Sequence, residues 1–217
     1  SPYTLSLHDA LPIFESSFTP CVFTTAVDRT IKILDAKSYD LLDTYDFPSP
    51  VLSLALSPQH HSRFLVAGMM EGSLYLMDLV SHIVLQKLKD HTKYIVKTAW
   101  SDDGRWVATI GYDKAVIIYE VVESAIVEEN ALLDGEEPDE LAATPRVELV
   151  KRHTHTTKTN PEAAVFLPGS SHLVFSARDD HLLHYLRLPA ASKSDEDFSL
   201  SSINLNENND AWVSFSM

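Results

Sequence analysis

Residues 107–120 read VATIGYDKAVIIYE, and the same fourteen-residue pattern recurs in register at 22–35 as VFTTAVDRTIKILD and at 65–78 as LVAGMMEGSLYLMD. The copies begin 43 and then 42 residues apart. A weaker fourth copy, LVFSARDDHLLHYL, occupies 173–186 and begins 66 residues after the third, because two insertions intervene. Repetition at a nearly fixed spacing predicts an array of one structural unit, in which each unit buries its apolar faces against its neighbours.

Each of the three strong copies divides into two short β-rich runs around a polar turn, at 28–29, 71–72 and 113–114. Alternating apolar residues on both sides of a two-residue turn predict a β-hairpin. Further strands are expected before and after the hairpins, at 40–47, 51–56, 83–88, 95–100, 147–150 and 163–166. A unit of about 40–45 residues with four strands is typical of a β-propeller, with one four-stranded antiparallel blade per unit.

The bulk composition limits the classes of partner. With 45% hydrophobic residues among 217, the chain can build a packed core. Its 17 basic and 31 acidic residues give a formal charge of −14, which opposes binding to nucleic acid or to an anionic membrane. No apolar run approaches the roughly 18–20 residues needed to cross a bilayer. The single cysteine, Cys21, favours a reducing compartment, so we expect a cytoplasmic or nuclear protein.

Two segments interrupt the repeat. Residues 120–148 hold ten acidic residues against the lone basic Arg146, so we expect an acidic insertion at 123–146 that is a solvated loop, with a short helix at 137–143. Residues 189–202, PAASKSDEDFSLSS, predict a second polar loop. Loops of this kind carry binding function in some propellers, although a solvated spacer is the commoner outcome.

The repeated segments resemble the WD-repeat β-propeller family over about 22–186. The resemblance is strongest at 91–120, where the stretch 94–109, YIVKTAWSDDGRWVAT, follows the family's order of strand, Ser-x-Asp-Gly turn and strand. The Trp-Asp pair that ends a blade in the family is replaced at all four positions, by Leu34-Asp35, Met77-Asp78, Tyr119-Glu120 and Tyr185-Leu186. The stretches DHTKYIVKTAW, TNPEAAVFLPG and AWVSF further resemble fungal WD-repeat proteins.

The resemblance implies an all-β, incomplete propeller of about four blades from a seven-bladed ring. We expect blades at about 20–47, 51–90, 94–150 and 161–209, with the start of another at 211–217. Residues 3–13 read YTLSLHDALPI, which resembles a translated sequencing adapter. We therefore interpret 1–13 as non-native and 14–217 as a partial propeller from a longer gene product; the alternative for 1–13 is a native N-terminal tail.

The resemblance also implies a buried chain of hydrogen bonds within the third blade. Carried over residue by residue, this structural tetrad comprises His91, Thr109, Asp113 and Tyr119, with tyrosine in place of tryptophan. A buried histidine needs a partner for each ring nitrogen, and a carboxylate in a hairpin turn can supply one of them. The other blades lack the histidine, so we expect their stability to come mainly from apolar packing.

Propellers commonly bind partners on the face formed by the loops that enter each blade and by the turns between the second and third strands. The exposed positions there that we expect to contact a partner are Lys93, Tyr94, Tyr112, Met70 and Arg178. Aromatic residues and arginine are enriched among residues that dominate binding energy. The alternative is that these side chains merely cover the ends of the sheets.

Motifs for metal, cofactor or catalytic chemistry are weak in this sequence. The pairs His153 and His155, and His181 and His184, are not accompanied by the further ligands that a zinc site needs. The sequence has no Gly-rich phosphate loop, Gly-x-Ser-x-Gly elbow or His-Glu-x-x-His helix. The basic cluster at 151–158 follows the acidic insertion, which favours local charge pairing over a nucleic-acid site. We therefore expect no metal, no cofactor, no small-molecule substrate and no enzymatic activity.

Three functions remain. The favoured one is a non-catalytic scaffold that binds other proteins on the propeller face. The second is a substrate-recognition or scaffold subunit of a ubiquitin ligase or chromatin complex. The third, an enzyme on a propeller scaffold, would place acidic or histidine residues at equivalent blade positions around the central channel, and the sequence shows no such gathering.

Overall fold

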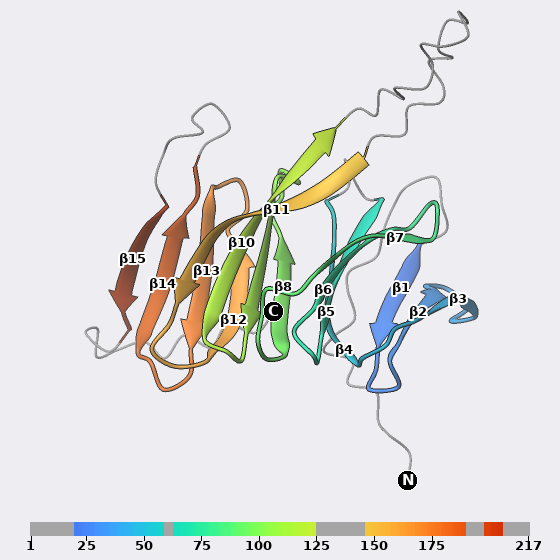
Figure 1. Cartoon of the computed structure of the whole chain (residues 1–217), viewed down its shortest axis with the longest axis horizontal. Coiled ribbons are helices and arrows are strands. Elements are labelled where there is room, and N and C mark those ends of the chain that lie inside the picture. Colours follow the sequence, from blue (N-terminus) through green and yellow to red (C-terminus); the bar gives the residue numbers. More distant parts are fainter. Residues whose placement is uncertain (1–19, 59–62, 125–145, 190–197, 206–217) are drawn as a thin grey trace, which may run out of the picture.

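The computed structural model describes residues 20–58, 63–124, 146–189 and 198–205, and within these ranges the only regular secondary structure is β-strand. The strands form four separate sheets, in which every pair of neighbouring strands is antiparallel and consecutive in the chain. Figure 1 shows the sheets in a row that follows the order of the sequence. We call them blades 1 to 4, and they confirm the predicted all-β propeller architecture.

The strands of blade 1 are β1 (Cys21–Thr25), β2 (Thr30–Asp35) and β3 (Leu41–Asp46). Blade 2 contains β4 (Val51–Leu56), β5 (Phe64–Met69), β6 (Leu74–Asp78) and β7 (Ile83–Leu88). Blade 3 contains β8 (Ile95–Trp100), β9 (Trp106–Gly111), β10 (Ala115–Ser124) and β11 (Arg146–Thr156). Blade 4 contains β12 (Pro161–Phe166), β13 (His172–Ala177), β14 (Leu182–Arg187) and β15 (Ser199–Asn204).

The predicted hairpins form because their turns contain residues that adopt a left-handed backbone. Arg29, Gly72 and Lys114 have φ values of 71°, 88° and 67°, and the N–H of each donates to the carbonyl three residues earlier. One left-handed residue after such a turn is typical of a three-residue hairpin loop, so each loop is one residue longer than the two-residue turn that the sequence predicted. The register of each hairpin then places alternate side chains on opposite faces of the sheet. The hairpin is therefore the unit that the fourteen-residue pattern specifies.

Apolar packing between successive blades makes up the core. In β9, Val107 packs in the cluster between blades 2 and 3, whereas Trp106 and Ala108 pack in the cluster between blades 3 and 4. In β5, Leu65 faces blade 1 and Val66 faces blade 3 in the same way. Because both faces of the middle strands are buried, all six residues of β5 and of β9 are buried. This explains why these strands read as nearly continuous apolar runs.

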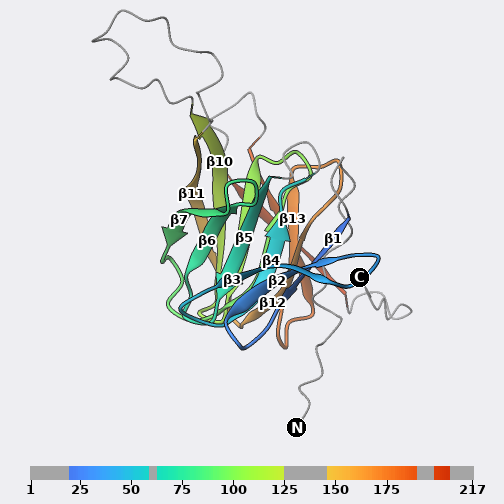
Figure 2. The same ribbon diagram turned by 90° about the vertical axis from the view of Figure 1, so that its right-hand side faces the viewer.

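Blade 3 carries a longer hairpin than its neighbours. Strands β10 and β11 contain 10 and 11 residues, and their outer parts extend beyond the other strands as an arm (Figure 2). The arm lies against β7, where Leu149 N donates to Gln86 Oε1 (2.7 Å) and Gln86 Nε2 donates to Leu149 O (3.2 Å). Val147 and Leu149 in the arm are buried in the core between blades 2 and 3.

The structure extends one strand that the sequence predicted and shows that another segment was assigned wrongly. The strand expected at 147–150 continues to Thr156, so most of the basic cluster belongs to β11. Residues 189–202 were expected to form a loop, but 199–204 form β15, because the outer edge of β14 offers backbone groups that a further strand satisfies. The predicted segments at 1–13, 137–143 and 211–217 lie outside the described residues, as does most of the acidic insertion.

Candidate binding face and the histidine network that supports it

The centre of the candidate site is a buried histidine in the loop that leads into β8. His91 is 2% exposed, and its Nδ1 lies 2.9 Å from Asp113 Oδ1 while its Nε2 lies 2.8 Å from Thr109 Oγ1. Because an ionised carboxylate can only accept, Nδ1 carries the hydrogen that joins the ring to Asp113. Both ring nitrogens are therefore satisfied, as the resemblance implied.

Asp113 also fixes the backbone around the histidine. Its carboxylate accepts from Thr92 N (2.8 Å) in the loop and from Ala115 N (3.2 Å) at the start of β10. Burial opposes ionisation of Asp113, but the hydrogen bonds from His91 and from the Thr92 backbone outweigh it and hold its pKa below the usual value. One carboxylate thus ties the loop before β8 to the turn between β9 and β10.

Tyr119, the fourth residue of the expected tetrad, is fully buried beside this network. Its hydroxyl donates to Asp90 Oδ2 (3.2 Å), and Lys151 Nζ donates to Asp90 Oδ1 (2.6 Å). Burial raises the pKa of Tyr119 well above its usual value, the Asp90 carboxylate adds to that rise, and Thr109 acts in the opposite direction. The structure therefore brings the four predicted residues together and adds Asp90, whose role we did not infer from the sequence.

Gly111 is a second residue that we missed. A Cβ at this position would lie 2.3 Å from His91 Nδ1 and 2.5 Å from Asp113 Oδ1, distances that no real contact allows. The matching positions in the other repeat copies are Ala26, Met69 and Ala177. Glycine is thus required in the one repeat copy that contains the histidine. The alignment of the repeats could have identified Gly111, because glycine occurs at this position only in that copy.

The loop before β8 also rests on blade 2. Gly72 has a φ of +88°, and a Cβ there would lie 2.4 Å from Lys93 O and 2.6 Å from His91 O. Beside it, Lys89 Nζ donates a hydrogen bond to Glu71 O. The turn between β5 and β6 therefore packs directly against the loop that carries Lys93 and Tyr94.

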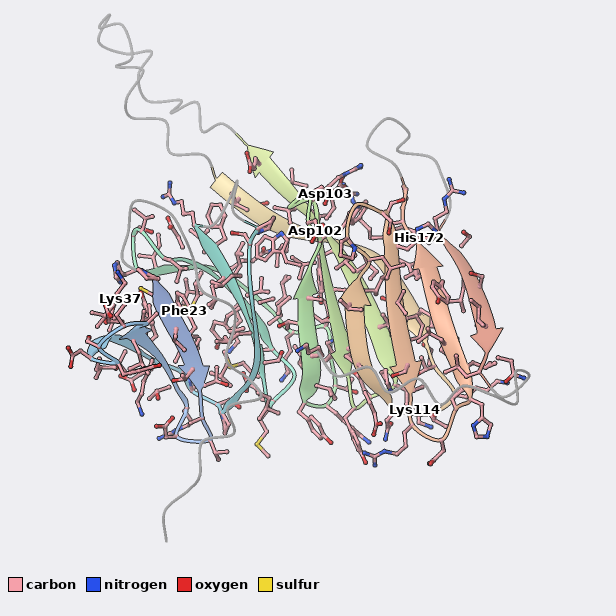
Figure 3. The ribbon with its side chains drawn as sticks, turned by 180° about the vertical axis from the view of Figure 1, so that it is seen from behind. Phe23, Lys37, Asp102, Asp103, Lys114 and His172 are labelled. Atoms are coloured by element: carbon pink, nitrogen blue, oxygen red, sulfur yellow. The ribbon has the colours of Figure 1, made fainter. Side chains whose placement is uncertain are left out.

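Three of the predicted partner-contacting residues occupy one equivalent position in successive blades. The backbone N–H of Met70, Tyr112 and Arg178 donates to the carbonyl of Pro50, Tyr94 and Asn160, at 2.8, 2.9 and 2.8 Å respectively. Each pair joins the entry to the first strand of a blade to the turn after its second strand. These residues consequently lie at the same end of the blades as Lys114, which Figure 3 shows opposite Asp102 and Asp103.

On this face, side chains from blades 3 and 4 form a cluster that we call the tyrosine patch, defined by Lys93, Tyr94, Tyr112 and Arg178. The rings of Tyr94 and Tyr112 stack with centroids 4.7 Å apart and planes 17° apart. Lys93 Nζ lies 5.4 Å from the centroid of the Tyr112 ring, within range of a cation–π interaction. Met70, the remaining candidate, holds the equivalent position on blade 2 and is 53% exposed.

Electrostatics link Arg178 of blade 4 to the tyrosines of blade 3. Burial raises the pKa of Tyr94, as does the neighbouring Tyr112, whereas the Arg178 guanidinium acts in the opposite direction. Arg178 Nε also donates to Glu162 Oε1 (2.6 Å), a pair in which both side chains are about half exposed. The tyrosine patch therefore spans the boundary between two blades.

Three histidines outside the network, His153, His155 and His184, have structural surroundings. His184 contacts Ser202 (2.8 Å) and Asp180 (3.2 Å) and stacks on Phe175, while His153 stacks on Phe198. Burial lowers the pKa of both His153 and His155. Within the part of the chain that the structure describes, no group of three His, Cys, Asp or Glu side chains is arranged to hold a metal ion. In the same residues, no helix is long and apolar enough to cross a membrane.

Two other sequence motifs are explained by local contacts. In the turn after β8, Asp103 accepts from Ser101 Oγ (2.5 Å) and from Arg105 N (3.1 Å), as expected of a tight turn between strands. In the basic cluster of β11, Lys151 pairs with Asp90 (2.6 Å) and Arg152 with Glu120 (2.8 Å). The two charges at the start of the cluster are thus paired within blade 3 and its entry loop.

The four antiparallel sheets define a β-propeller protein, and sequence comparison agrees with this class. The family model described as "WD domain, G-beta repeat" matches residues 83–120, which run from β7 to Glu120 in β10 and include the histidine network. The matched segment agrees with the resemblance to the WD-repeat family that the sequence predicted.

Part of the chain is also similar to the "Probable cytosolic iron-sulfur protein assembly protein 1" of the yeast Kluyveromyces lactis. The two are 31% identical over 114 residues, and the match covers 46% of this chain and 33% of that protein. The chain thus matches about a third of the length of this curated relative.

Among solved structures, the fold is similar to chains of a humanized mutant of the Chaetomium thermophilum Polycomb Repressive Complex 2, bound to either of two inhibitors. The TM-score is 0.64 in both cases, at 14% and 13% identity. The likeness covers 87% and 88% of this chain and 39% and 40% of those chains. At this level of identity it establishes the fold alone.

Proposed function

We propose that this protein is a non-catalytic scaffold that binds other proteins through the face containing the tyrosine patch. The observation that supports this most directly is the stacked, partly exposed pair Tyr94 and Tyr112, 4.7 Å apart, at the boundary of two blades. Large aromatic rings beside a lysine and an arginine are the composition of binding hot spots.

The surroundings of the patch favour recognition because they are preorganised. The loop that carries Lys93 and Tyr94 is held by Asp113 on one side and rests on Gly72 of blade 2 on the other. Tyr112 is held by the hydrogen bond from its N–H to Tyr94 O (2.9 Å). A surface that is already ordered loses little conformational entropy on binding, which leaves more of the contact energy for affinity.

Affinity purification of the tagged chain followed by mass spectrometry tests this proposal. The variant Tyr94→Ala plus Tyr112→Ala should lose the partners that the parent chain recovers. Tyr39→Ala is the matched control, because Tyr39 is 71% exposed and lies in the turn between β2 and β3, at the opposite end of the blades. An unchanged partner set in the double variant would exclude the tyrosine patch as the binding face.

We also propose a more specific role for this protein-binding scaffold, as a subunit of a larger assembly in the cytoplasm or nucleus. The similarity to a cytosolic iron-sulfur protein assembly protein favours an assembly factor, although it extends over less than half of the chain. A substrate-recognition or scaffold subunit of a ubiquitin ligase or chromatin complex is the alternative. The identities of the co-purified proteins discriminate among these assemblies.

A further inference from the structure

The tyrosine patch carries positive charge on a chain that is strongly negative overall. The whole chain has a formal charge of −14. At the patch, however, Lys93 lies over the Tyr112 ring, and Arg178 interacts electrostatically with both tyrosines. Lys114 follows Asp113 in the same turn as Tyr112 and is exposed. Lys93 and Arg178 thus place two cations at the stacked rings, and Lys114 adds a third in the same turn as Tyr112.

The carboxylates near these cations leave them available to a ligand. Asp113 is committed to His91 and to the backbone of the loop. Among the described residues, neither Lys93 nor Lys114 forms an ion pair. Arg178 forms one ion pair, with Glu162, and the two side chains are 55% and 48% exposed. Because an exposed ion pair contributes little free energy, a carboxylate of a ligand can replace Glu162 at small cost.

The chemistry of the ligand follows from this arrangement. Exposed ammonium and guanidinium groups recognise carboxylates, and the flat tyrosine pair offers a surface against which an aliphatic or aromatic side chain packs. A polymer with an anion at every unit, such as RNA, is disfavoured by the −14 charge of the whole chain. A short segment with a few carboxylates beside an apolar side chain needs only the local contacts.

We propose that the tyrosine patch binds an acidic linear segment of a partner protein, with carboxylates at Lys93, Lys114 and Arg178 and an apolar side chain against Tyr94 and Tyr112. This inference rests on the proposed function and specifies the kind of partner. It predicts binding that weakens as salt rises, because exposed ion pairs are screened.

Fluorescence anisotropy with the full chain tests the inference directly. The probe is a fluorescein-labelled peptide in which glutamates alternate with leucine and phenylalanine. The comparison probes replace every glutamate with glutamine or with lysine, and a labelled single-stranded RNA is measured in parallel. We expect saturable binding of the acidic peptide, at least about tenfold weaker binding of the glutamine peptide, and no binding of the lysine peptide or RNA.

Charge variants locate the contact. Lys93→Ala plus Arg178→Ala should weaken binding of the acidic peptide about tenfold, which corresponds to about 1.4 kcal/mol. Lys37→Ala plus Arg187→Ala is the matched control, because it removes the same charge from exposed positions at the opposite end of blades 1 and 4. The control should bind the acidic peptide with unchanged affinity, and an equal loss in both variants would overturn the inference.

The inference and the proposed function fail in different ways. If Tyr94→Ala plus Tyr112→Ala loses its cellular partners but the parent chain does not distinguish the acidic from the glutamine peptide, the face binds proteins by other chemistry and the inference is wrong. If the RNA binds more tightly than the acidic peptide, the inference is also wrong.

Discussion

Blades 1 and 3 are built from copies of the same sequence pattern, yet they are stabilised differently. In blade 3 the carboxylate of the turn, Asp113, anchors a buried histidine and two backbone N–H groups. In blade 1 the corresponding Asp28 accepts only from Thr30 and Lys32, next to its own turn. The histidine network is therefore a local reinforcement of one blade, whereas the apolar contacts between sheets are common to all blades.

The two blades also differ in how they meet their neighbours. Blade 3 packs against apolar clusters on both sides. Blade 1 joins blade 2 partly through a more exposed polar contact, in which His82 Nδ1 lies 2.6 Å from the Tyr45 hydroxyl and 2.9 Å from Asp43 Oδ2. Blade 3, which carries three of the four residues of the tyrosine patch, is thus packed by apolar side chains on both faces.

Gly111→Ala should have the largest effect. The new methyl group would displace the His91 ring and leave Thr109 and Asp113 without their partner, which we expect to lower the free energy of unfolding by about 3 kcal/mol. The reciprocal change in blade 1, Ala26→Gly, should cost about 0.5–1 kcal/mol, because it only adds backbone freedom. Chemical denaturation of both variants measures the difference, and equal losses would mean that the network contributes little.

The variants Asp113→Ala and Asp28→Ala compare how much the carboxylate of each turn contributes to the free energy of unfolding. Loss of the Asp113 carboxylate leaves His91 Nδ1–H and the Thr92 N–H without an acceptor, at an expected cost of about 2 kcal/mol. Loss of Asp28 removes exposed hydrogen bonds and an exposed ion pair, at an expected cost below about 1 kcal/mol. Urea unfolding curves with a common m-value provide the test. A larger loss of unfolding free energy in Asp28→Ala than in Asp113→Ala would contradict the conclusion that the Asp113 network stabilises blade 3.

Gly72→Ala tests whether blade 2 supports the loop of blade 3. A methyl group there meets the carbonyl oxygens of His91 and Lys93, so we expect a loss about 1–2 kcal/mol greater than that of the control Gly169→Ala. The control also changes a glycine with positive φ, +66°, but its Cβ would meet no atom within 4 Å. The backbone strain is thus common to both variants. Equal losses in thermal unfolding would show that the loop does not depend on Gly72.

The smallest expected effect concerns pH. Burial lowers the pKa of His153 and His155 below the ordinary value of 6.5, so the folded state favours their neutral forms. Stability should be complete above about pH 6.5 and should fall as the pH drops through the lower folded-state values, because the unfolded chain then binds more protons. His153→Phe plus His155→Phe should flatten this dependence in thermal melts between about pH 7 and pH 5. An unchanged slope would exclude these two residues as its source.

The repeated hairpins could be predicted because they depend on a local alternation of apolar residues, whereas the members of the histidine network were predicted from the resemblance to the WD-repeat family. Gly111 was not predicted, because the need for glycine arises from a ring supplied by a distant loop. The sequence did not assign a partner to Asp90, since Asp90 and Tyr119, whose hydroxyl donates to it, lie 29 residues apart in the chain. Strand β15 was missed because its six residues are exposed and rich in serine, so no apolar periodicity marks them.

The long hairpin of blade 3 offers a position where the chain can be altered. Ser124 and Arg146 are paired neighbours at the tip of the arm, and Ala115, beside the tyrosine patch, lies at the other end of β10, about 30 Å away at the usual rise of a strand. A foreign domain spliced between Ser124 and Arg146 would leave the register of both strands intact. The arm is thus a natural attachment point for a fluorescent reporter, remote from the surface whose ligands it would detect.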